Sequence, residues 1–472
     1  MSNLKGPANS LCWGEPPSGG VMTEGHALAA IRFGYGLPLP EGASAGTADM
    51  LALLRGPDRA AEEWPLPRLP DVLPAMQALQ AAFRLPAGDP VKTEKLREAR
   101  ITIRTQMHHS AAIAVARALG SPDGFRERLV QFWSGHFAVL ARRLRDSALP
   151  GALVEDAIRP HLAGRFSDLL AAVTLHPAMI AYLDQGSSVG QLSVIGRRRG
   201  RGLNENLARE LMELHTLGVG AAYSQADVTQ MAELLTGLGF DPVKGFVFRR
   251  RAAEPGAETV LGIRYEGEGL APIRAALDDL AARPETARHV ATKLARHFVA
   301  DDPDPDLVAI VKEAFLATRG DLLAVYGALL DHPAAWTVRR MKVRQPFDYV
   351  VAGLRALDVR PEEVGRLPAR RLARLILDPM RGMGQPWQRP GGPDGWPEEA
   401  EAWITPPRLS ARILWALDMP TAFRRELPEP ALLADRALGP YAGKELHLAA
   451  SRAESRRDAT ALVLASAEFN RR

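Results

Sequence analysis

The stretch NENLARELMELHTLGVGAAYSQADVTQMAELLTG, residues 204–237, predicts two amphipathic helices joined by a short link. Asn204 is a favoured residue for the N-cap of the first helix, and Gly218 suits the position just after its end. Leucines between them recur three and four residues apart, which places them on one apolar face. We therefore expect a helix over 205–217.

The second helix begins at Ser224, and Asp227 three residues later completes the pattern of a capping box. Its apolar residues face the first helix once the link GVGAAY turns the chain back. Similar helix-period patterns recur along most of the chain, with alanine, leucine and arginine dominating. The predicted fold class is therefore all-α, built from packed helical hairpins.

Two segments interrupt the helical pattern. Residues 241–268 contain two short β-prone runs, GFVFRRR and ETVLGIRY, which predict a small β-hairpin inserted between helices. Residues 380–406 are rich in Gly, Pro and Trp and predict an ordered, packed loop. Residues 1–22 have the composition of an unstructured lead-in, so residues 23–472 are expected to form a single α-helical body.

Two parts of the chain, about 126–184 and 287–336, share short patterns in the same order. A His-Phe pair at 136–137 recurs at 297–298, and a DLL run followed by His-Pro occurs downstream in both parts. These matches predict an internal duplication of one helical unit, in which the packing of one copy recurs in the other.

The composition excludes several classes of protein. The chain has 472 residues, a formal net charge of +4 and one cysteine, so neither an intrachain disulfide nor a cysteine-based zinc site can form. The mild basicity is spread along the chain, and no nucleic-acid partner is expected. The N-terminus has no apolar export signal, and no apolar run approaches the ~18 residues of a membrane span. These features predict a cytoplasmic protein without a membrane span.

The predicted helix 205–217 carries the first candidates for chemistry. At about 100° per residue, Glu210 and Glu213 lie along one edge of its apolar face, and His215 falls on the opposite edge. The histidine therefore cannot join the two glutamates as a ligand from the same helix.

Two interpretations of the glutamates remain open. In the first, they meet His136 or Asp227 across the bundle and form a metal-assisted or acid–base site. In the second, which we favour, they pair with arginine, because Arg209 precedes Glu213 by four residues and an arginine-rich loop lies close in sequence. For His136 itself, the structural alternative is a bond to a backbone carbonyl between packed aromatic side chains.

Two loops are candidate ligand-binding surfaces. Tryptophans of the Gly/Pro-rich loop form a stacking platform for sugars or other planar groups, or else pack the loop onto the body; they are Trp387, Trp396 and Trp403. Arginines of the basic loop either bind phosphate or sulfate or remain exposed to solvent. They are Arg197, Arg198, Arg199 and Arg201. The sequence contains no nucleotide or flavin signature and no GxSxG or HExxH motif, so the cofactor is unknown.

Several blocks of the sequence also match a known family in order. FWSGHF, HPAMIAYLD, ETVLGIRYEGEG, MKVRQPFDYVV and the 204–237 stretch are similar to motifs of the bacterial domain-of-unknown-function family 1800. The resemblance covers roughly residues 25 to 470. It implies a mostly α-helical protein, often encoded beside a sulfatase-like protein that is its implied partner, and it implies no established reaction.

Two features depart from the pattern of this family. Its members commonly carry a His-Glu-Pro-Gly run in the β-prone segment, where this chain has Ala253 in place of the histidine. Many relatives are exported, whereas this chain begins without an export signal. We therefore expect a ligand- or partner-binding helical protein, and keep as the alternative a hydrolytic or oxidative enzyme that uses the carboxylates of helix 205–217.

Overall fold

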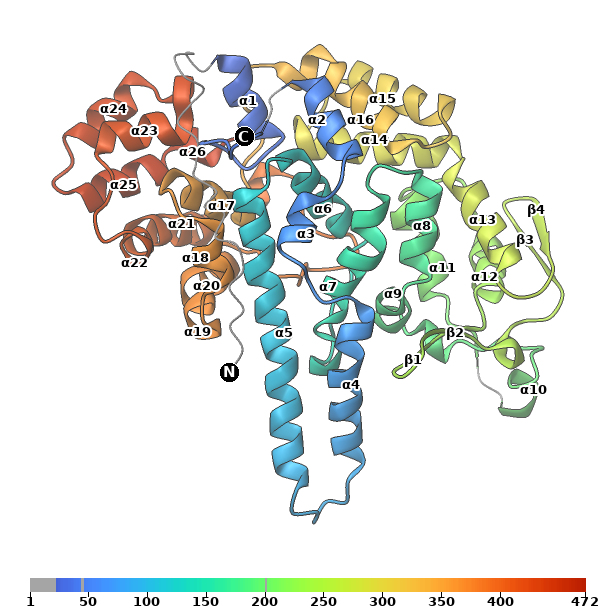
Figure 1. The fold of residues 1–472 in the computed structure, drawn as a ribbon. Helices are drawn as coiled ribbons and strands as arrows, with labels where there is room; N and C mark the ends of the chain where they lie inside the picture. Colours follow the sequence, from blue (N-terminus) through green and yellow to red (C-terminus); the bar gives the residue numbers. More distant parts are fainter. Residues whose placement is uncertain (1–22, 44–45, 200–201) are drawn as a thin grey trace.

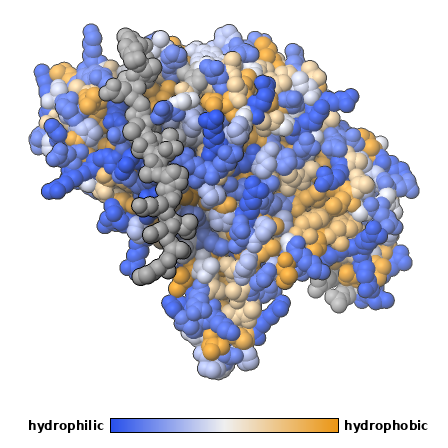
Figure 2. Space-filling view, viewed as in Figure 1, coloured by the Kyte–Doolittle hydropathy of each residue, from blue (hydrophilic) through white to orange (hydrophobic). Residues whose placement is uncertain are grey.

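The structure is a computed structural model that describes residues 23–43, 46–199 and 202–472, so the predicted lead-in lies outside the described residues. Helices dominate it (Figure 1), and the strands of the described residues form two small two-stranded sheets. The protein is therefore mostly α-helical, which confirms the predicted fold class. Figure 2 shows hydrophilic residues over much of one face, with apolar residues gathered between them.

The N-terminal region ends in a long helical hairpin that projects from the rest of the molecule (Figure 1). The helices of this region are α1 (Glu24–Arg32), α2 (Thr47–Arg55), α3 (Arg59–Glu63), α4 (Leu69–Arg84) and α5 (Lys92–Gly120). α4 and α5 form the hairpin and enclose a small apolar cluster that includes Leu79 and Ile103. Near its far end, Phe83 is 55% exposed.

The central region encloses the larger of two main apolar cores, which draws residues from Phe33 to Ala335. Its helices follow one another around this core. They are α6 (Gly124–His136), α7 (Leu149–Leu153), α8 (Phe166–Thr174), α9 (Pro177–Tyr182), α10 (Gly196–Arg199), α11 (Asn206–Glu210), α12 (Gln225–Leu234), α13 (Ala271–Ala281), α14 (Pro284–Phe298), α15 (Pro305–Ala317) and α16 (Leu322–Asp331).

The C-terminal region encloses the second core together with the last part of α5. The segment 380–406 links two of its helices, and the structure describes all of it. The helices of this region are α17 (Pro346–Ala356), α18 (Pro361–Gly365), α19 (Ala369–Leu372), α20 (Asp378–Gly382), α21 (Pro406–Asp418), α22 (Pro420–Phe423), α23 (Pro430–Leu438), α24 (Lys444–Ser451), α25 (Arg456–Ala465) and α26 (Ala467–Asn470).

The helix predicted over 205–217 is present but changes its winding. Asn204 stands just before the N-cap residue Glu205, and its side-chain oxygen accepts from the N–H of Asn206 at 3.0 Å. After α11 the chain continues as a π-helical turn, η5 (Leu211–Thr216), in which backbone bonds reach five residues rather than four. An extra residue in the turn rotates the following side chains away from the positions of an ideal α-helix.

The β-structure differs from the predicted single hairpin. The two β-prone runs do not pair with each other, because the first pairs with the strand before it and the second folds back on itself. β1 (Leu238–Asp241) pairs with β2 (Gly245–Phe248), and β3 (Ala257–Val260) pairs with β4 (Ile263–Glu266), both antiparallel. The turn DPVK after β1 and the Leu-Gly turn after β3 are short enough to close each hairpin locally.

The two parts of the predicted duplication contact each other at several places. An antiparallel bridge joins Arg165 and Asp321, which stand at the start of the matching DLL segments. His176 and His332 then play the same role, because the Nδ1 of each accepts from the N–H two residues later, at 3.1 and 3.2 Å. These shared details agree with a repeated unit, which stays a prediction.

Candidate functional site

The arginine that was predicted to pair with Glu213 has a different partner. Arg209 donates to Glu205 at 3.1 Å and not to Glu213, so that part of the interpretation is wrong. No described residue forms an ion pair with Glu210 or Glu213. The pKa of Glu210 is raised, first by burial and then by the charges of Glu213 and Asp394.

The other candidates near this helix have structural partners. Asp227 forms the predicted capping box with Ser224, and its second oxygen accepts from the N–H of Leu261 at 2.7 Å. Arg197 and Arg198 are exposed on α10, while the side chain of Arg199 and the whole of Arg201 lie outside the described part of the structure. Across the described ranges, no three His, Cys, Asp or Glu side chains are arranged to hold a metal ion.

Two histidine side chains occupy the end of the 206–216 helix. His136 donates through Nε2 to the carbonyl oxygen of His215 at 3.2 Å, and His289 donates to that of Leu214 at 3.0 Å. Phe132 stacks beside His136, with 6.3 Å between ring centroids. The predicted bond between His136 and a backbone carbonyl, among aromatic rings, is therefore confirmed.

Several titratable side chains therefore lie close together in the interior of the protein. The ring centroids of His136 and His215 are 6.2 Å apart, and those of His136 and His289 are 5.9 Å apart. Burial lowers the pKa of each of these three histidines, and the positive charge of Lys293 lowers it further. We call these four residues the histidine–lysine cluster.

Sequence reasoning missed part of this cluster. His289 and Lys293 stand four residues apart on α14, and His297 follows after another four. That spacing of titratable residues on one helical face was the available signal. An ideal α-helix places His215 away from the two glutamates, so His215 was not grouped with them. No local sequence pattern predicts the π-helical turn.

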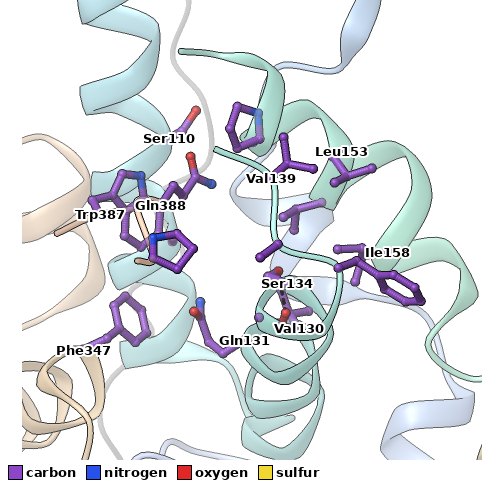
Figure 3. A pocket seen from close by; sticks show the side chains of 18 of the residues that line it. Ser110, Val130, Gln131, Ser134, Val139, Leu153, Ile158, Phe347, Trp387 and Gln388 are labelled. Carbon is purple, nitrogen blue, oxygen red and sulfur yellow. Dashed lines mark hydrogen bonds between the residues drawn. The ribbon is translucent and has the colours of Figure 1, made fainter. Parts of the chain in front are cut away.

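A cavity of about 80 Å³ lies where the two apolar cores meet, and we call it the junction pocket. It opens between α5, α6, α7 with the following π-helical turn η2 (Val154–Ile158), and the segment after α20 (Figure 3). Apolar side chains form much of its wall, including Val130, Leu153 and Phe347. Polar side chains also line it: Ser110, Gln131, Ser134 and Gln388.

Two of the three candidate tryptophans line the junction pocket. They are Trp387 and Trp396. The indole N–H of Trp387 is buried and has no hydrogen-bond partner among the described residues. Trp403 is instead 1% exposed and donates to the carbonyl oxygen of Pro397 at 3.0 Å, so it packs the loop.

A close backbone contact seats the tryptophan loop against α6. Gly395 has φ +88°, and a Cβ placed on it would lie 2.1 Å from the carbonyl oxygen of Gly135. Only glycine allows both the left-handed conformation and this approach. The contact places the loop beside both the junction pocket and the histidine–lysine cluster, because Gly135 lines the pocket and His136 follows it.

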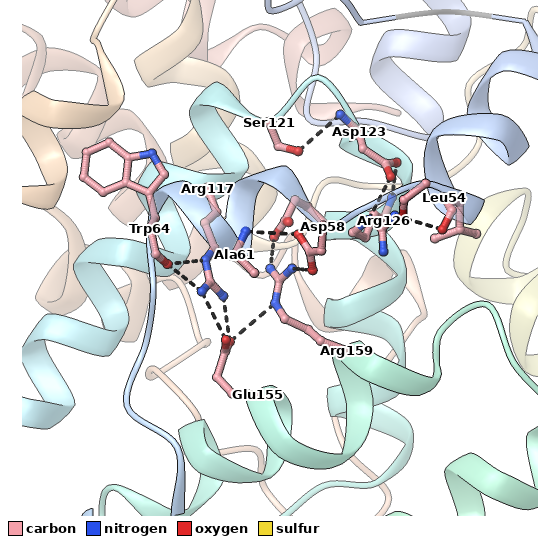
Figure 4. A network of polar contacts seen from close by, with 12 residues as sticks. Leu54, Asp58, Ala61, Trp64, Arg117, Ser121, Asp123, Arg126, Glu155 and Arg159 are labelled. Carbon is pink, nitrogen blue, oxygen red and sulfur yellow. Dashed lines mark hydrogen bonds and ion pairs between the residues drawn. The ribbon is translucent and has the colours of Figure 1, made fainter. Parts of the chain in front are cut away.

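The floor of the junction pocket is a buried ion-pair network (Figure 4). Arg117 donates to both carboxylate oxygens of Glu155, at 2.6 and 3.1 Å. Arg159 donates to Asp58 at 2.7 Å and to Glu127 at 2.5 Å, and its Nε lies 3.4 Å from Glu155. The second oxygen of Glu127 is buried without a partner among the described residues. Three carboxylates thus face two guanidinium groups.

The comparison with known families agrees with the sequence motifs. A family model described as "Protein of unknown function (DUF1800)" matches residues 29–471, nearly the whole chain. The chain belongs to this family. No curated protein and no solved structure matches it. For this DUF1800 protein, the chemistry of the site must therefore be argued from its own residues.

One further property of the DUF1800 chain follows from its helices. Over the described ranges, none of them combines the length and the apolar character that crossing a membrane requires. This agrees with the expectation of no membrane span.

Proposed function

We propose that this DUF1800 protein binds a small, neutral, hydroxylated organic molecule in the junction pocket. The observation that carries the proposal is the buried indole N–H of Trp387, which has no partner among the described residues although its side chain lines the junction pocket. A buried donor without a partner costs about 1–3 kcal/mol. An acceptor oxygen on a ligand removes that cost.

The volume and lining of the pocket set the size and polarity of this ligand. A cavity of about 80 Å³ has room for about five to eight water-sized groups. Small-molecule sites are mostly apolar with a few polar groups that fix orientation, and here these groups are the amides Gln131 and Gln388 and the hydroxyls Ser110 and Ser134. Such groups suit a short polyol.

The charge of the floor favours a ligand without negative charge. Arg117 and Arg159 are already committed to three carboxylates, so neither guanidinium is available to an anion. The buried free oxygen of Glu127 is an acceptor, which matches a hydroxyl donor and repels a carboxylate. The proposed ligand therefore both donates and accepts hydrogen bonds while remaining neutral.

Ligand-observed NMR with two probes of equal size tests the proposal. Erythritol is a neutral polyol, and succinate is a dianion with the same number of non-hydrogen atoms. We expect saturation transfer from the protein to erythritol, and its loss in Trp387→Phe, which keeps an aromatic ring but removes the N–H. The matched control is Trp336→Phe, whose indole donates to Leu330 outside the pocket. Absence of erythritol binding, equal binding by both variants, or stronger binding of succinate contradicts the proposal.

A further inference from the structure

The histidine–lysine cluster lies between two helices that cross in opposite directions. Near one end of the contact, Arg128 of α6 lies 3.1 Å from the Nε2 of His297 of α14. Near the other end, the rings of His136 and His289 approach to 5.9 Å. Lys293 lies midway between the two histidines of α14, four residues from each. It therefore lies on the same face of α14, which is turned toward α6.

Lys293 has no direct partner in this place. It forms no hydrogen bond and no ion pair with a described residue. The nearest carboxylate charges are those of Glu398 and Asp394. Glu398 is already engaged, because it accepts from His297 at 2.7 Å and lies 3.2 Å from the Nζ of Lys342.

Lys342 provides the contrast within the same protein. It is 1% exposed, and its ammonium contacts Asp301 at 2.5 Å as well as Glu398. Lys293 lacks both contacts, so burial lowers its pKa to about 8, and the more distant charges of Glu398 and Asp394 offset only part of this effect. Lys293 is partly exposed, and an amine of this pKa is about one-tenth free base at pH 7.

The other members of the histidine–lysine cluster are uncharged imidazoles. Burial lowers the pKa of His215 to about 3 and that of His289 to about 4, and it lowers the pKa of His136 well below its usual value. All three imidazoles are therefore neutral near pH 7. The Nδ1 atoms of His136 and His215 are buried and have no partner among the described residues.

We propose that Lys293 is a reactive amine that forms a Schiff base with a small neutral aldehyde or ketone. The amine nitrogen attacks the carbonyl carbon, and a proton moves from nitrogen to the carbonyl oxygen to give a carbinolamine. Loss of one water molecule, made of the hydroxyl group and a second proton from nitrogen, then gives the imine. No oxidant or reductant takes part. The acidic groups Asp394 and Glu398 disfavour an anionic carbonyl compound.

This site goes beyond the proposed binding function, because Lys293 is not among the residues that line the junction pocket. Its reactivity is tested independently of erythritol binding. The full-length protein is incubated with glycolaldehyde and cyanoborohydride, which reduces the imine to a stable secondary amine. Peptide mass spectrometry then gives the rate of labelling at each lysine.

The pKa of about 8 sets the expected rates. At pH 7, an amine of this pKa has about 230 times more free base than a lysine of ordinary pKa near 10.4. Because lower basicity also weakens the nucleophile, we expect labelling of Lys293 to be about tenfold faster than that of the exposed Lys244 and Lys444. The rate at Lys293 should level off above about pH 8, while the rates at the exposed lysines continue to rise.

Labelling of Lys293 no faster than that of the exposed lysines, or a rate that rises without levelling off, overturns the proposal. Lys293→Arg keeps the charge but should lose the fast-labelled peptide, and Lys342→Arg should keep it. Because the decisive rates come from the unmodified protein, a variant that fails to fold leaves the test intact.

Discussion

The carboxylate of Glu155 contacts both arginines in the floor of the junction pocket. Its replacement tests how much these ion pairs contribute to the free energy of unfolding. Its side chain is 6% exposed, and it accepts from Arg117 through both oxygens. Glu155→Gln keeps the shape and removes the charge. Arg159 then retains Glu127 and Asp58, whereas Arg117 loses the one carboxylate that pairs with it among the described residues.

The magnitude follows from leaving a buried cation without its partner. Breaking a buried ion pair on one side costs about 3–5 kcal/mol. Arg117 still donates to the carbonyl oxygen of Trp64 at 2.9 Å, so we expect the lower end, about 3 kcal/mol. Equilibrium urea unfolding followed by circular dichroism measures the loss.

Two controls make this result specific. In Arg117→Met the cation itself is removed, so the double variant with Glu155→Gln should lose less stability than the sum of the two single losses. Glu94→Gln breaks the exposed pair with Arg97 and should leave the unfolding curve unchanged. A loss below about 1 kcal/mol in Glu155→Gln, or simple additivity in the double variant, refutes the reasoning.

Two further predictions concern titratable groups around the same helix. His136 and His215 are neutral in the folded state because burial lowers their pKa values, that of His215 to about 3, so unfolding takes up protons below the ordinary pKa of about 6.5. Above that pH, these histidines should not lower the free energy of unfolding. Below about pH 6, the free energy of unfolding should fall by about 1.4 kcal/mol per pH unit for each histidine. Equal urea midpoints at pH 7 and pH 5 contradict this. The pKa of Glu210 is raised by burial, Glu213 and Asp394, so Glu210→Gln removes a disfavoured charge at pH 7. Its melting temperature should stay level or rise, and a fall of more than about 2 °C argues against this account.

Local patterns were sufficient for the fold class and for the ends of several helices. The capping box at Ser224 and the side-chain bond from Asn204 act within three residues, so sequence spacing alone reveals them. The β-pairing was wrong because strand propensity does not say which runs pair. The turn DPVK, which joins β1 to β2, carried the missing information.

The candidate site was predicted only in part, because it depends on contacts between distant segments. The loop tryptophans were recognised by their composition, yet the sequence could not separate Trp387, which lines a pocket, from Trp403, which packs inside. Arg209 pairs with Glu205, four residues before it, rather than with Glu213, four residues after it. The two spacings are equal, so the sequence does not distinguish these pairs. The approach of His136 to the helix end needs the π-helical turn, which no local residue specifies.

The most direct test of the binding account observes the tryptophans themselves. In protein labelled with 5-fluorotryptophan, single Trp-to-Phe variants assign the ¹⁹F resonances of Trp387, Trp396, Trp403 and Trp415. We predict that erythritol shifts the resonances of Trp387 and Trp396 saturably and leaves those of Trp403 and Trp415 in place, because only the first two line the junction pocket. Unchanged positions for Trp387 and Trp396 at saturating erythritol, or equal shifts of all four resonances, contradict it.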